Sequence, residues 1–193
     1  MIPYVIERGP KDQERVYDLY SRLLKDRIVF IRGPFNQDMA DSVVAQLLFL
    51  ETSDPTEDIR LYINSPGGQV DAMYAIYDVM NYVTPDIVTV GIGHCASAAS
   101  FILAAGTKGK RYALPNTEIM IHELSTGTQG KAGDVRNYVK HMERLYDKMA
   151  KHYVGFTGQR LAKIKKDMER DFFMYAEEAV EYGLIDEVHE SRS

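Results

Sequence analysis

Strand-like and helix-like hydrophobic patterns alternate through the middle of this chain. Three short runs rich in β-branched residues have the composition of buried strands, at 28–31, 59–63 and 87–90. The first two runs are each followed by apolar residues at helical spacing, which predicts helices from Asn36 or Asp38 to about Glu51 and over about 69–83. Such alternation implies βαβ crossovers, because a helix returns the chain to the same end of the sheet. We predict an α/β fold with a largely parallel sheet covered by helices.

The two ends of the chain have weaker patterns. Residues 1–11 carry two prolines and a glycine and look like a flexible or edge segment. Helical spacing of apolar residues predicts a helix from Asp12 to Asp26. Towards the C-terminus we predict strands and short helices at 112–114, 118–122, 159–167, 176–182 and 184–188.

The longest predicted helix follows a polar, glycine-rich connection at residues 125–133. Asp134 is expected to cap this helix, which runs to roughly Tyr153 and is therefore about 30 Å long. Its apolar stripe either packs into the core or contacts another subunit. We favour the subunit contact, because the tyrosines and methionines of the stripe suit an interface and the helix is long enough to project.

The strand, turn and helix over residues 87–105 form the stretch most suggestive of chemistry. A β-branched strand crosses two glycines and becomes an alanine-rich helix, with Ser97 at the changeover. A serine at a helix start is commonly an N-cap. It equally suits a nucleophile here, because small neighbours allow close approach and the start of a helix leaves N–H groups free. The pattern leaves both interpretations open.

Three further positions offer the other groups that acyl transfer requires. His122 ends a predicted strand, so it either faces a cleft or is a core histidine bonded to backbone. Asp171 precedes two phenylalanines and is either an ordinary surface acid or a buried carboxylate bonded to an imidazole. The turn at 64–68 has two glycines, which permit outward-pointing N–H groups but also form an ordinary Pro-Gly turn.

Composition narrows the possible functions. The 193 residues carry a net charge of −5, which argues against a nucleic-acid-binding protein. A single cysteine, Cys95, excludes an internal disulfide and fits a reducing cytosol, and its apolar flanks favour inert packing over nucleophilic chemistry. The start of the chain lacks signal-peptide character and no apolar run reaches the length of a membrane span, so we expect a cytoplasmic protein. Phosphate-binding glycine motifs, metal-ligand spacings and the Gly-x-Ser-x-Gly frame are not found, so no cofactor is expected.

Several strings, in the same order along almost the whole chain, resemble the ClpP family, the proteolytic subunits of Clp ATP-dependent proteases. The similarity runs from about residue 3 to residue 189, and its most specific string is Tyr-Ile-Asn-Ser-Pro-Gly-Gly. The matching strings are Tyr20–Arg27, Val44–Glu51, Leu61–Gly68, Gly106–Arg111, Met120–His122 and Glu177–Leu184.

This resemblance implies a crotonase-like fold of repeated βαβ units with a projecting handle helix at about 123–155. It implies a serine endopeptidase whose catalytic triad is Ser97, His122 and Asp171, with an oxyanion hole formed by the N–H groups of Gly68 and Ala98. His122 would accept the Ser97 proton and Asp171 would hold the histidine tautomer.

The resemblance also implies an assembly of two stacked heptameric rings, homo-oligomeric or mixed with a paralogue, fed with unfolded polypeptide by a Clp-family AAA+ unfoldase. Residues 1–17 would form axial loops, and 18–193 a single peptidase domain. Glu169 and Arg170 would join the rings, and the unfoldase would dock in a pocket formed by Tyr62, Tyr82, Tyr112 and Leu114.

Several positions depart from the family pattern. The usual Ser-Met-Gly-Ala is here Ser97-Ala-Ala-Ser100, and the usual His-Gln-Pro is His122-Glu-Leu124. Arg60 and His189 stand where apolar residues are common. These departures keep open a weakly active or inactive structural subunit of a mixed ring, and more remotely a crotonase-type acyl-CoA enzyme.

Overall fold

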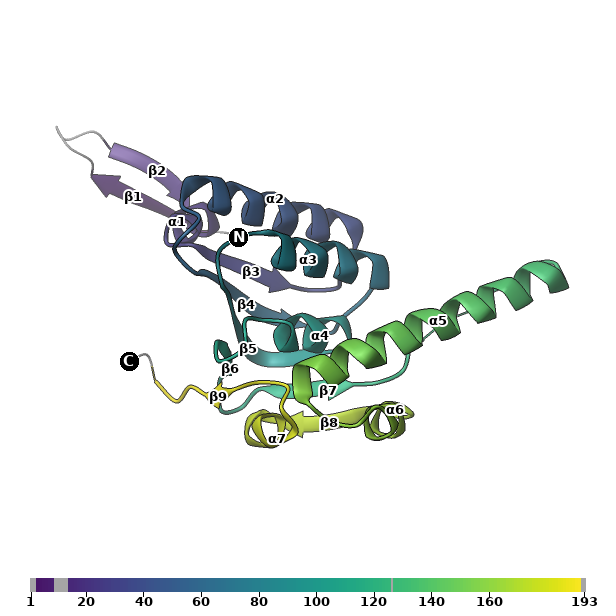
Figure 1. Cartoon of the computed structure of the whole chain (residues 1–193). Helices are drawn as coiled ribbons and strands as arrows, with labels where there is room; N and C mark the ends of the chain where they lie inside the picture. Colours follow the sequence, from purple (N-terminus) through teal and green to yellow (C-terminus); the bar gives the residue numbers. More distant parts are fainter. Residues whose placement is uncertain (1–2, 9–13, 126, 192–193) are drawn as a thin grey trace.

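A mostly parallel sheet forms the centre of the computed structural model, which describes residues 3–8, 14–125 and 127–191 (Figure 1). Its strands follow the order β3-β4-β5-β6-β9, while β7 pairs with β5 and β8 pairs antiparallel with β7. The predicted α/β class with repeated βαβ units is confirmed. The strands are β3 (Ile28–Arg32), β4 (Ile59–Ser65), β5 (Ile87–Ala96), β6 (Arg111–Ala113), β7 (Glu118–Ile121), β8 (Phe172–Tyr175) and β9 (Glu187–Val188).

The ten-residue strand β5 serves two partners along its length. Its first part pairs with β6 through Thr89–Gly91, and its last part pairs with β7 through His94–Ala96. The sheet therefore forks, and the last residues of β5 lie beside β7. This brings the turn at Ser97 next to the segment that leads into His122.

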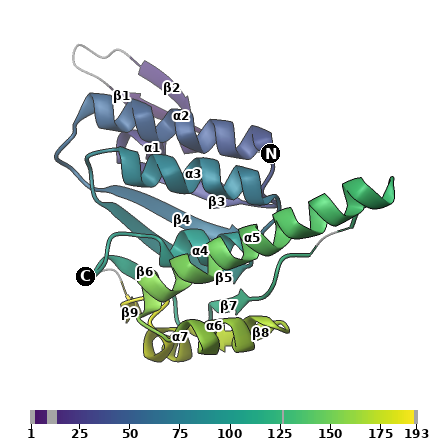
Figure 2. The ribbon, with the colours of Figure 1, turned by 45° about the vertical axis from the view of Figure 1, so that its right-hand side comes forward.

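Helices cover the sheet and one of them extends beyond it. Figure 2 shows α2 and α3 side by side over the strands, and α5 crossing near α4 before it leaves the body. In the described ranges, no helix combines the length and apolar character needed to cross a bilayer. The helices are α1 (Leu19–Lys25), α2 (Gln37–Ser53), α3 (Val70–Tyr82), α4 (Ala98–Ala104), α5 (Ala132–Thr157), α6 (Leu161–Met168) and α7 (Ala176–Tyr182).

The predicted helix from Asp12 to Asp26 is wrong in its first part. Residues 14–18 form strand β2 (Glu14–Asp18), antiparallel to β1 (Tyr4–Arg8), and the helix α1 starts only at Leu19. Asp18 explains the boundary, because its carboxylate accepts the N–H of Ser21 at 3.0 Å as an N-cap. Of the predicted axial segment, residues 1–2 and 9–13 lie outside the described residues.

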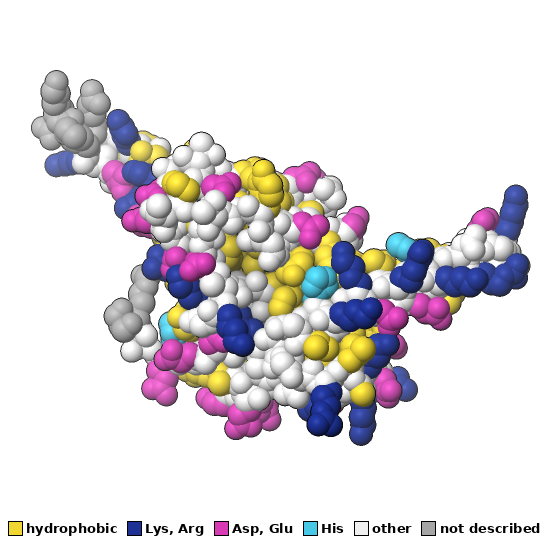
Figure 3. Space-filling view, viewed as in Figure 1, with side chains coloured by type: hydrophobic (Ala, Val, Ile, Leu, Met, Phe, Trp, Pro, Cys, Tyr) yellow, Lys and Arg dark blue, Asp and Glu magenta, His cyan; other side chains and the backbone are white. Residues whose placement is uncertain are grey.

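The helix α5 is longer than predicted and mostly lies outside the core. It begins at Ala132 with Lys131 as N-cap, so Asp134 lies in the first turn rather than capping it. Its buried residues, Met149, Ala150 and Tyr153, all lie in the last third of its 26 residues. Figure 3 shows Lys and Arg side chains along the projecting part, where exposed basic residues recur every four positions, at Arg136, Lys140, Arg144 and Lys148.

A buried ion pair ties the C-terminal segment to the sheet. The side chain of Arg111 on β6 is only 4% exposed and lies 2.7 Å from Asp186, through Nη2 and Oδ1. Asp186 also accepts the Arg111 Nε–H and the N–H groups of Arg111 and Gly109. The guanidinium donates further to the carbonyls of Ala104 and Phe156, so one buried cation holds β6, α4, α5 and the approach to β9 together. Only residues 187–188 of the predicted strand 184–188 pair in the sheet.

Candidate active site

Ser97 lies in a strained turn between β5 and α4. Its backbone has φ 57° and ψ −118°, a conformation that non-glycine residues adopt at a cost of about 1–3 kcal/mol. The Ser97 N–H donates to the carbonyl of Met120 at 2.8 Å, which fixes the turn to strand β7. Ser97 occupies the N-cap position of α4, but its hydroxyl makes no capping hydrogen bond. The simple N-cap interpretation therefore fails, and the hydroxyl is available for other chemistry.

The glycine turn after β4 lies directly against the Ser97 turn. A Cβ atom on Gly67 would be 2.7 Å from both the Ala96 carbonyl and Ser97 Cβ, and 3.0 Å from the Ala98 nitrogen. Gly67 also has φ 89°, which disfavours any side chain. Only glycine allows this approach, so the two turns that carry the predicted oxyanion donors form one surface.

Both predicted oxyanion donors are free of acceptors in the described part of the chain. Phe35 and Gly68 form a parallel β-bridge, in which the Phe35 N–H donates to the Gly67 carbonyl and the Phe35 carbonyl accepts from the Gln69 N–H. Because successive backbone groups point to opposite sides, the Gly68 N–H points away from Phe35. Ala98 is the first residue of α4, whose N–H has no partner within the helix. Two N–H groups beside Ser97 are what a developing oxyanion requires.

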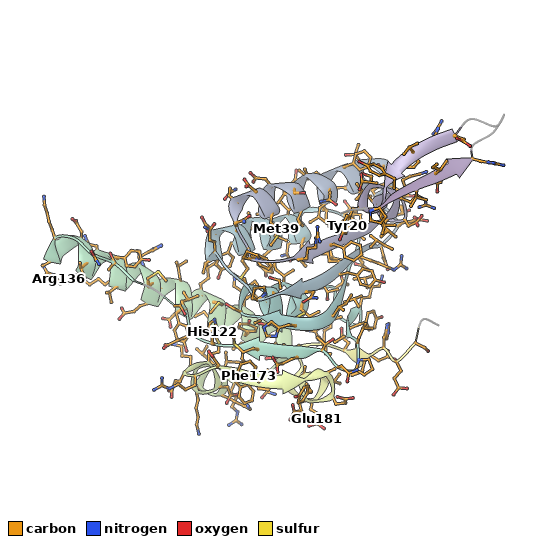
Figure 4. The ribbon with its side chains drawn as sticks, turned by 180° about the vertical axis from the view of Figure 1, so that it is seen from behind. Tyr20, Met39, His122, Arg136, Phe173 and Glu181 are labelled. Atoms are coloured by element: carbon orange, nitrogen blue, oxygen red, sulfur yellow. The ribbon has the colours of Figure 1, made fainter. Side chains whose placement is uncertain are left out.

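The antiparallel pairing of β7 and β8 brings His122 and Asp171 together. Ile121 is paired with Phe172, so the next residue along β7 lies opposite the residue before β8. His122 Nδ1 lies 3.1 Å from Asp171 Oδ1. This contact favours the tautomer with the proton on Nδ1 and leaves Nε2 as the acceptor. Figure 4 shows His122 at the end of its strand, close to the labelled Phe173 of β8.

The structure joins these groups in pairs rather than in one continuous chain. Ser97 is bonded to residue 120, two positions before His122, but its hydroxyl makes no hydrogen bond to the imidazole among the described residues. Catalytic hydrogen bonds of this kind often tighten only when substrate is present. Asp171 bonds the imidazole, as one of the two interpretations of its sequence predicted. That interpretation also predicted a buried carboxylate, but the Asp171 side chain is 58% exposed.

His94 takes no part in this group. It pairs across the strands with Glu118, with Nδ1 3.1 Å from Oε1. The sequence places His94 only three residues before Ser97, but the strand directs its ring to β7 instead.

Cys95 is a packing residue. Its thiol is fully buried and donates to the Ile63 carbonyl at 3.2 Å. Burial raises the pKa of the Cys95 thiol to about 12, so almost no thiolate forms near neutral pH.

We expect native Cys95 to resist alkylation by iodoacetamide at pH 7.5 and to react within minutes after unfolding in guanidinium. Intact mass measured over time checks this. A native adduct that forms at the rate of free cysteine would contradict the burial and restore Cys95 as a nucleophile candidate.

A hollow of about 220 Å³ lies immediately beyond His122, and sequence reasoning did not find it. It combines an apolar floor with two carboxylates at its rim. The sequence held one signal for it, the departures from the family pattern at Glu123 and Leu124. In the structure both residues line the hollow together with apolar residues of the long helix. The lining residues are Glu123, Leu124, Val139, Met142, Glu143 and Tyr146.

Two of the four predicted unfoldase-docking residues line the same surface hollow. Tyr62 and Tyr112 line one surface hollow of about 450 Å³, while Tyr82 and Leu114 do not line it and are 77% and 38% exposed. His189 stacks on Tyr112 with ring centroids 3.8 Å apart, so this departure from the family pattern becomes part of the wall. The remaining lining residues are Asp58, Arg60, Val88, Val90 and Lys110.

The predicted ring contacts, Glu169 and Arg170, lie on the surface at the end of α6. Both are exposed, and neither makes an ion pair within the described residues. They directly precede Asp171, so any contact they make acts on the segment that holds the carboxylate.

Comparison with known protein families identifies the family of the chain. The family model described as Clp protease matches residues 11–192, which is almost the whole chain. The match includes the Ser97 turn, the end of β7, and the segment before β8. The chain therefore belongs to the Clp protease family.

Proposed function

We propose that this chain is a serine endopeptidase subunit with Ser97 as nucleophile, His122 as general base and Asp171 as the group that orients the base. Membership of the Clp protease family supports a ClpP-like peptidase. The observation that carries the residue assignment is the 3.1 Å contact between His122 and Asp171, at a strand end joined to the Ser97 turn.

The acylation step uses these groups in sequence. His122 Nε2 takes the proton of the Ser97 hydroxyl as the oxygen attacks the scissile carbonyl carbon, and a tetrahedral intermediate forms. The N–H groups of Gly68 and Ala98 stabilise its negative oxygen. The carbon–nitrogen bond then breaks, the leaving amine takes the proton from the imidazolium, and an acyl ester remains on Ser97.

Deacylation repeats the same chemistry with water. His122 removes a proton from water as the water oxygen attacks the ester carbon, and a second tetrahedral intermediate forms. The bond between that carbon and the Ser97 oxygen then breaks, the Ser97 oxygen takes the proton from the imidazolium, and the peptide leaves as a carboxylic acid. Asp171 stabilises the imidazolium in both steps, while its exposure limits that stabilisation in the free subunit. A neighbouring chain that covers Asp171 would strengthen it.

We further propose the assembly in which this site works. Members of the Clp protease family generally form rings and work with Clp ATPases. We assign this chain to two stacked heptameric rings, uniform or mixed with a paralogue, with α5 as the handle and Glu169 and Arg170 at the contact between rings. The hollow that contains Tyr62 and Tyr112 would take the docking loops of an AAA+ unfoldase, together with Tyr82 and Leu114. Unfolded polypeptide is the substrate.

A fluorophosphonate probe tests the nucleophile. We expect the Ser97 oxygen of the assembled protein to displace fluoride from the probe, so that each chain carries one phosphonyl group. Peptide mass spectrometry should locate this group on Ser97. The same treatment of a Ser97→Ala variant should give no adduct. A control variant at an exposed serine, Ser42→Ala, should be labelled like the wild type.

The alternative outcomes are distinct. No labelling in any assembly state, alone or with a paralogue and its unfoldase, would reject the peptidase assignment and favour a structural subunit. An adduct on another serine would reject the triad while keeping the activity.

A further inference from the structure

Behind the Ser97 turn lies a buried pair of hydroxyl groups that the proposed triad does not use. Ser100 on α4 is fully buried, and its Oγ lies 2.7 Å from the carbonyl oxygen of Ser97. The same Oγ lies 3.0 Å from the hydroxyl of Tyr153, which is 1% exposed and belongs to the base of α5. These residues are 53 positions apart, so the contact links the long helix to the nucleophile turn.

The direction of both hydrogen bonds follows from counting protons. A carbonyl oxygen can only accept, so the single hydroxyl proton of Ser100 is donated to Ser97. Ser100 Oγ must then accept from Tyr153, which donates its phenolic proton. Burial raises the pKa of Tyr153 well above its ordinary value, so the phenol keeps that proton at any working pH. The result is a directed chain from Tyr153 through Ser100 to the Ser97 carbonyl.

This chain acts on the peptide group that carries a proposed oxyanion donor. The Ser97 carbonyl and the Ala98 N–H belong to one planar trans peptide, in which the two groups point in opposite directions. Anchoring the Ser97 oxygen therefore aims the Ala98 N–H. The N–H of Phe101 holds the same oxygen at 3.1 Å, so the carbonyl has two donors on the helix side.

The strained backbone at Ser97 requires such anchoring. With φ 57° at Ser97, the turn is held only because surrounding contacts fix it. Hydrogen bonds in series also polarise one another, and a carbonyl that accepts strongly makes its own amide N–H a better donor. Both effects favour the same donor, the Ala98 N–H.

We propose that Ser100 and Tyr153 are positioning residues, which hold the Ser97–Ala98 peptide so that the Ala98 N–H faces the oxyanion. This inference rests on the proposed function of Ser97. The two hydroxyl groups touch neither substrate nor the reacting atoms, and they act on the transition state through one peptide plane. They also make the seating of α5 on α4 part of the catalytic geometry.

Two variants and a matched control test this proposal in the assembled, peptide-hydrolysing protein. Ser100→Ala removes the direct donor, and Tyr153→Phe removes only the outer hydroxyl while the ring keeps its packing. Thr89→Val is the control. The Thr89 hydroxyl is equally buried and donates to the Leu103 carbonyl of α4 at 2.8 Å, and Leu103 lies at the other end of that helix from Ser97. Urea unfolding measures the stability of each variant.

We expect kcat to fall roughly 10–100-fold in Ser100→Ala and about 3–10-fold in Tyr153→Phe, with KM nearly unchanged, because loss of a whole oxyanion donor costs about 100–1,000-fold. Inhibition by a peptide aldehyde, which forms a tetrahedral oxyanion on the nucleophile, should weaken by the same factors. Thr89→Val should lose similar stability and keep kcat within twofold. In the double variant, Tyr153→Phe should add almost nothing to Ser100→Ala.

The inference is overturned if both variants keep kcat and aldehyde affinity within twofold of the wild type, or if Thr89→Val lowers them equally. If Ser100→Ala does not fold, the Tyr153→Phe result decides alone. Failure of the proposed function looks different, since the wild type itself would then carry no fluorophosphonate adduct on Ser97. A labelled, active wild type with unaffected variants rejects only the positioning role.

Discussion

Replacing Ser97 with alanine is expected to lower kcat for a fluorogenic peptide by about a million-fold, to the background left by binding and the oxyanion donors. The substitution removes the only oxygen that can form the acyl ester, and no neighbouring group can replace it. Cys95 is buried with its thiol protonated, and the hydroxyl of Ser100 is buried and donates its proton to the Ser97 carbonyl. Alanine tolerates the positive φ about as well as serine, so the fold should survive.

Combining this change with His122→Ala is the sharpest control. Residues that act as a unit are not additive, so the double variant should be no slower than Ser97→Ala alone. Steady-state kinetics with high enzyme concentrations can follow the residual rate. A Ser97→Ala protein that keeps one part in a thousand of the wild-type rate would place the nucleophile elsewhere.

The largest expected effect on stability is that of Asp186→Ala, about 3–5 kcal/mol of unfolding free energy. The substitution leaves the Arg111 guanidinium buried without its counter-charge, and two backbone N–H groups lose their acceptor. Because domains of this size are stable by only about 5–15 kcal/mol, the variant should unfold at much lower urea. Far-UV circular dichroism measures the midpoint, and Asp147→Ala, which breaks the exposed pair with Lys165, should shift it far less.

Acid should also remove the stability that the Arg111–Asp186 ion pair contributes to the wild type. Burial alone would raise the pKa of Asp186, but the hydrogen bonds and charge of Arg111 outweigh it and lower that pKa below its ordinary value. A lowered folded pKa means that the stabilisation is complete above the unfolded value, near 4, and is lost as the pH falls through the folded value. The difference between wild type and Asp186→Ala should therefore shrink below about pH 4. A constant difference down to pH 2 would contradict the ion-pair explanation.

The sequence predicted the parts of the fold that depend on local pattern. The runs predicted as strands at residues 28–31, 59–63 and 87–90 all lie within observed strands, and they and the helices between them were recognisable from their hydrophobic pattern. The strand at 14–18 was mistaken for a helix because its apolar residues continue in helical register into α1. Only the antiparallel pairing with the neighbouring strand β1 decides that case.

The candidate site was predictable in its parts but not in its geometry. Ser97 stood out because small residues surround a strand-to-helix turn. The pattern at Asp171 left a surface acid and an imidazole-bonded carboxylate both open, and only the family resemblance favoured the second. The partner of Asp171, His122, lies 49 residues away, and the strand β8 that joins them has just four residues. The contact between Ser100 and Tyr153 left no local signal at all, since each residue alone looks like ordinary helix packing.

The projecting part of α5 has one further consequence for the isolated subunit. Val139, Met142 and Tyr146 wall the hollow beside His122, yet they precede the first buried residue of that helix, Met149. Tyr146 is still held by its hydrogen bond to the Lys165 carbonyl, but the turns before it have little packing surface. Such turns are only marginally stable in water, so we expect them to unwind readily in an isolated subunit. A solitary chain would then keep Ser97 in its turn but lose part of the wall of the hollow beside His122. Dilution alone would then weaken any binding that depends on that wall.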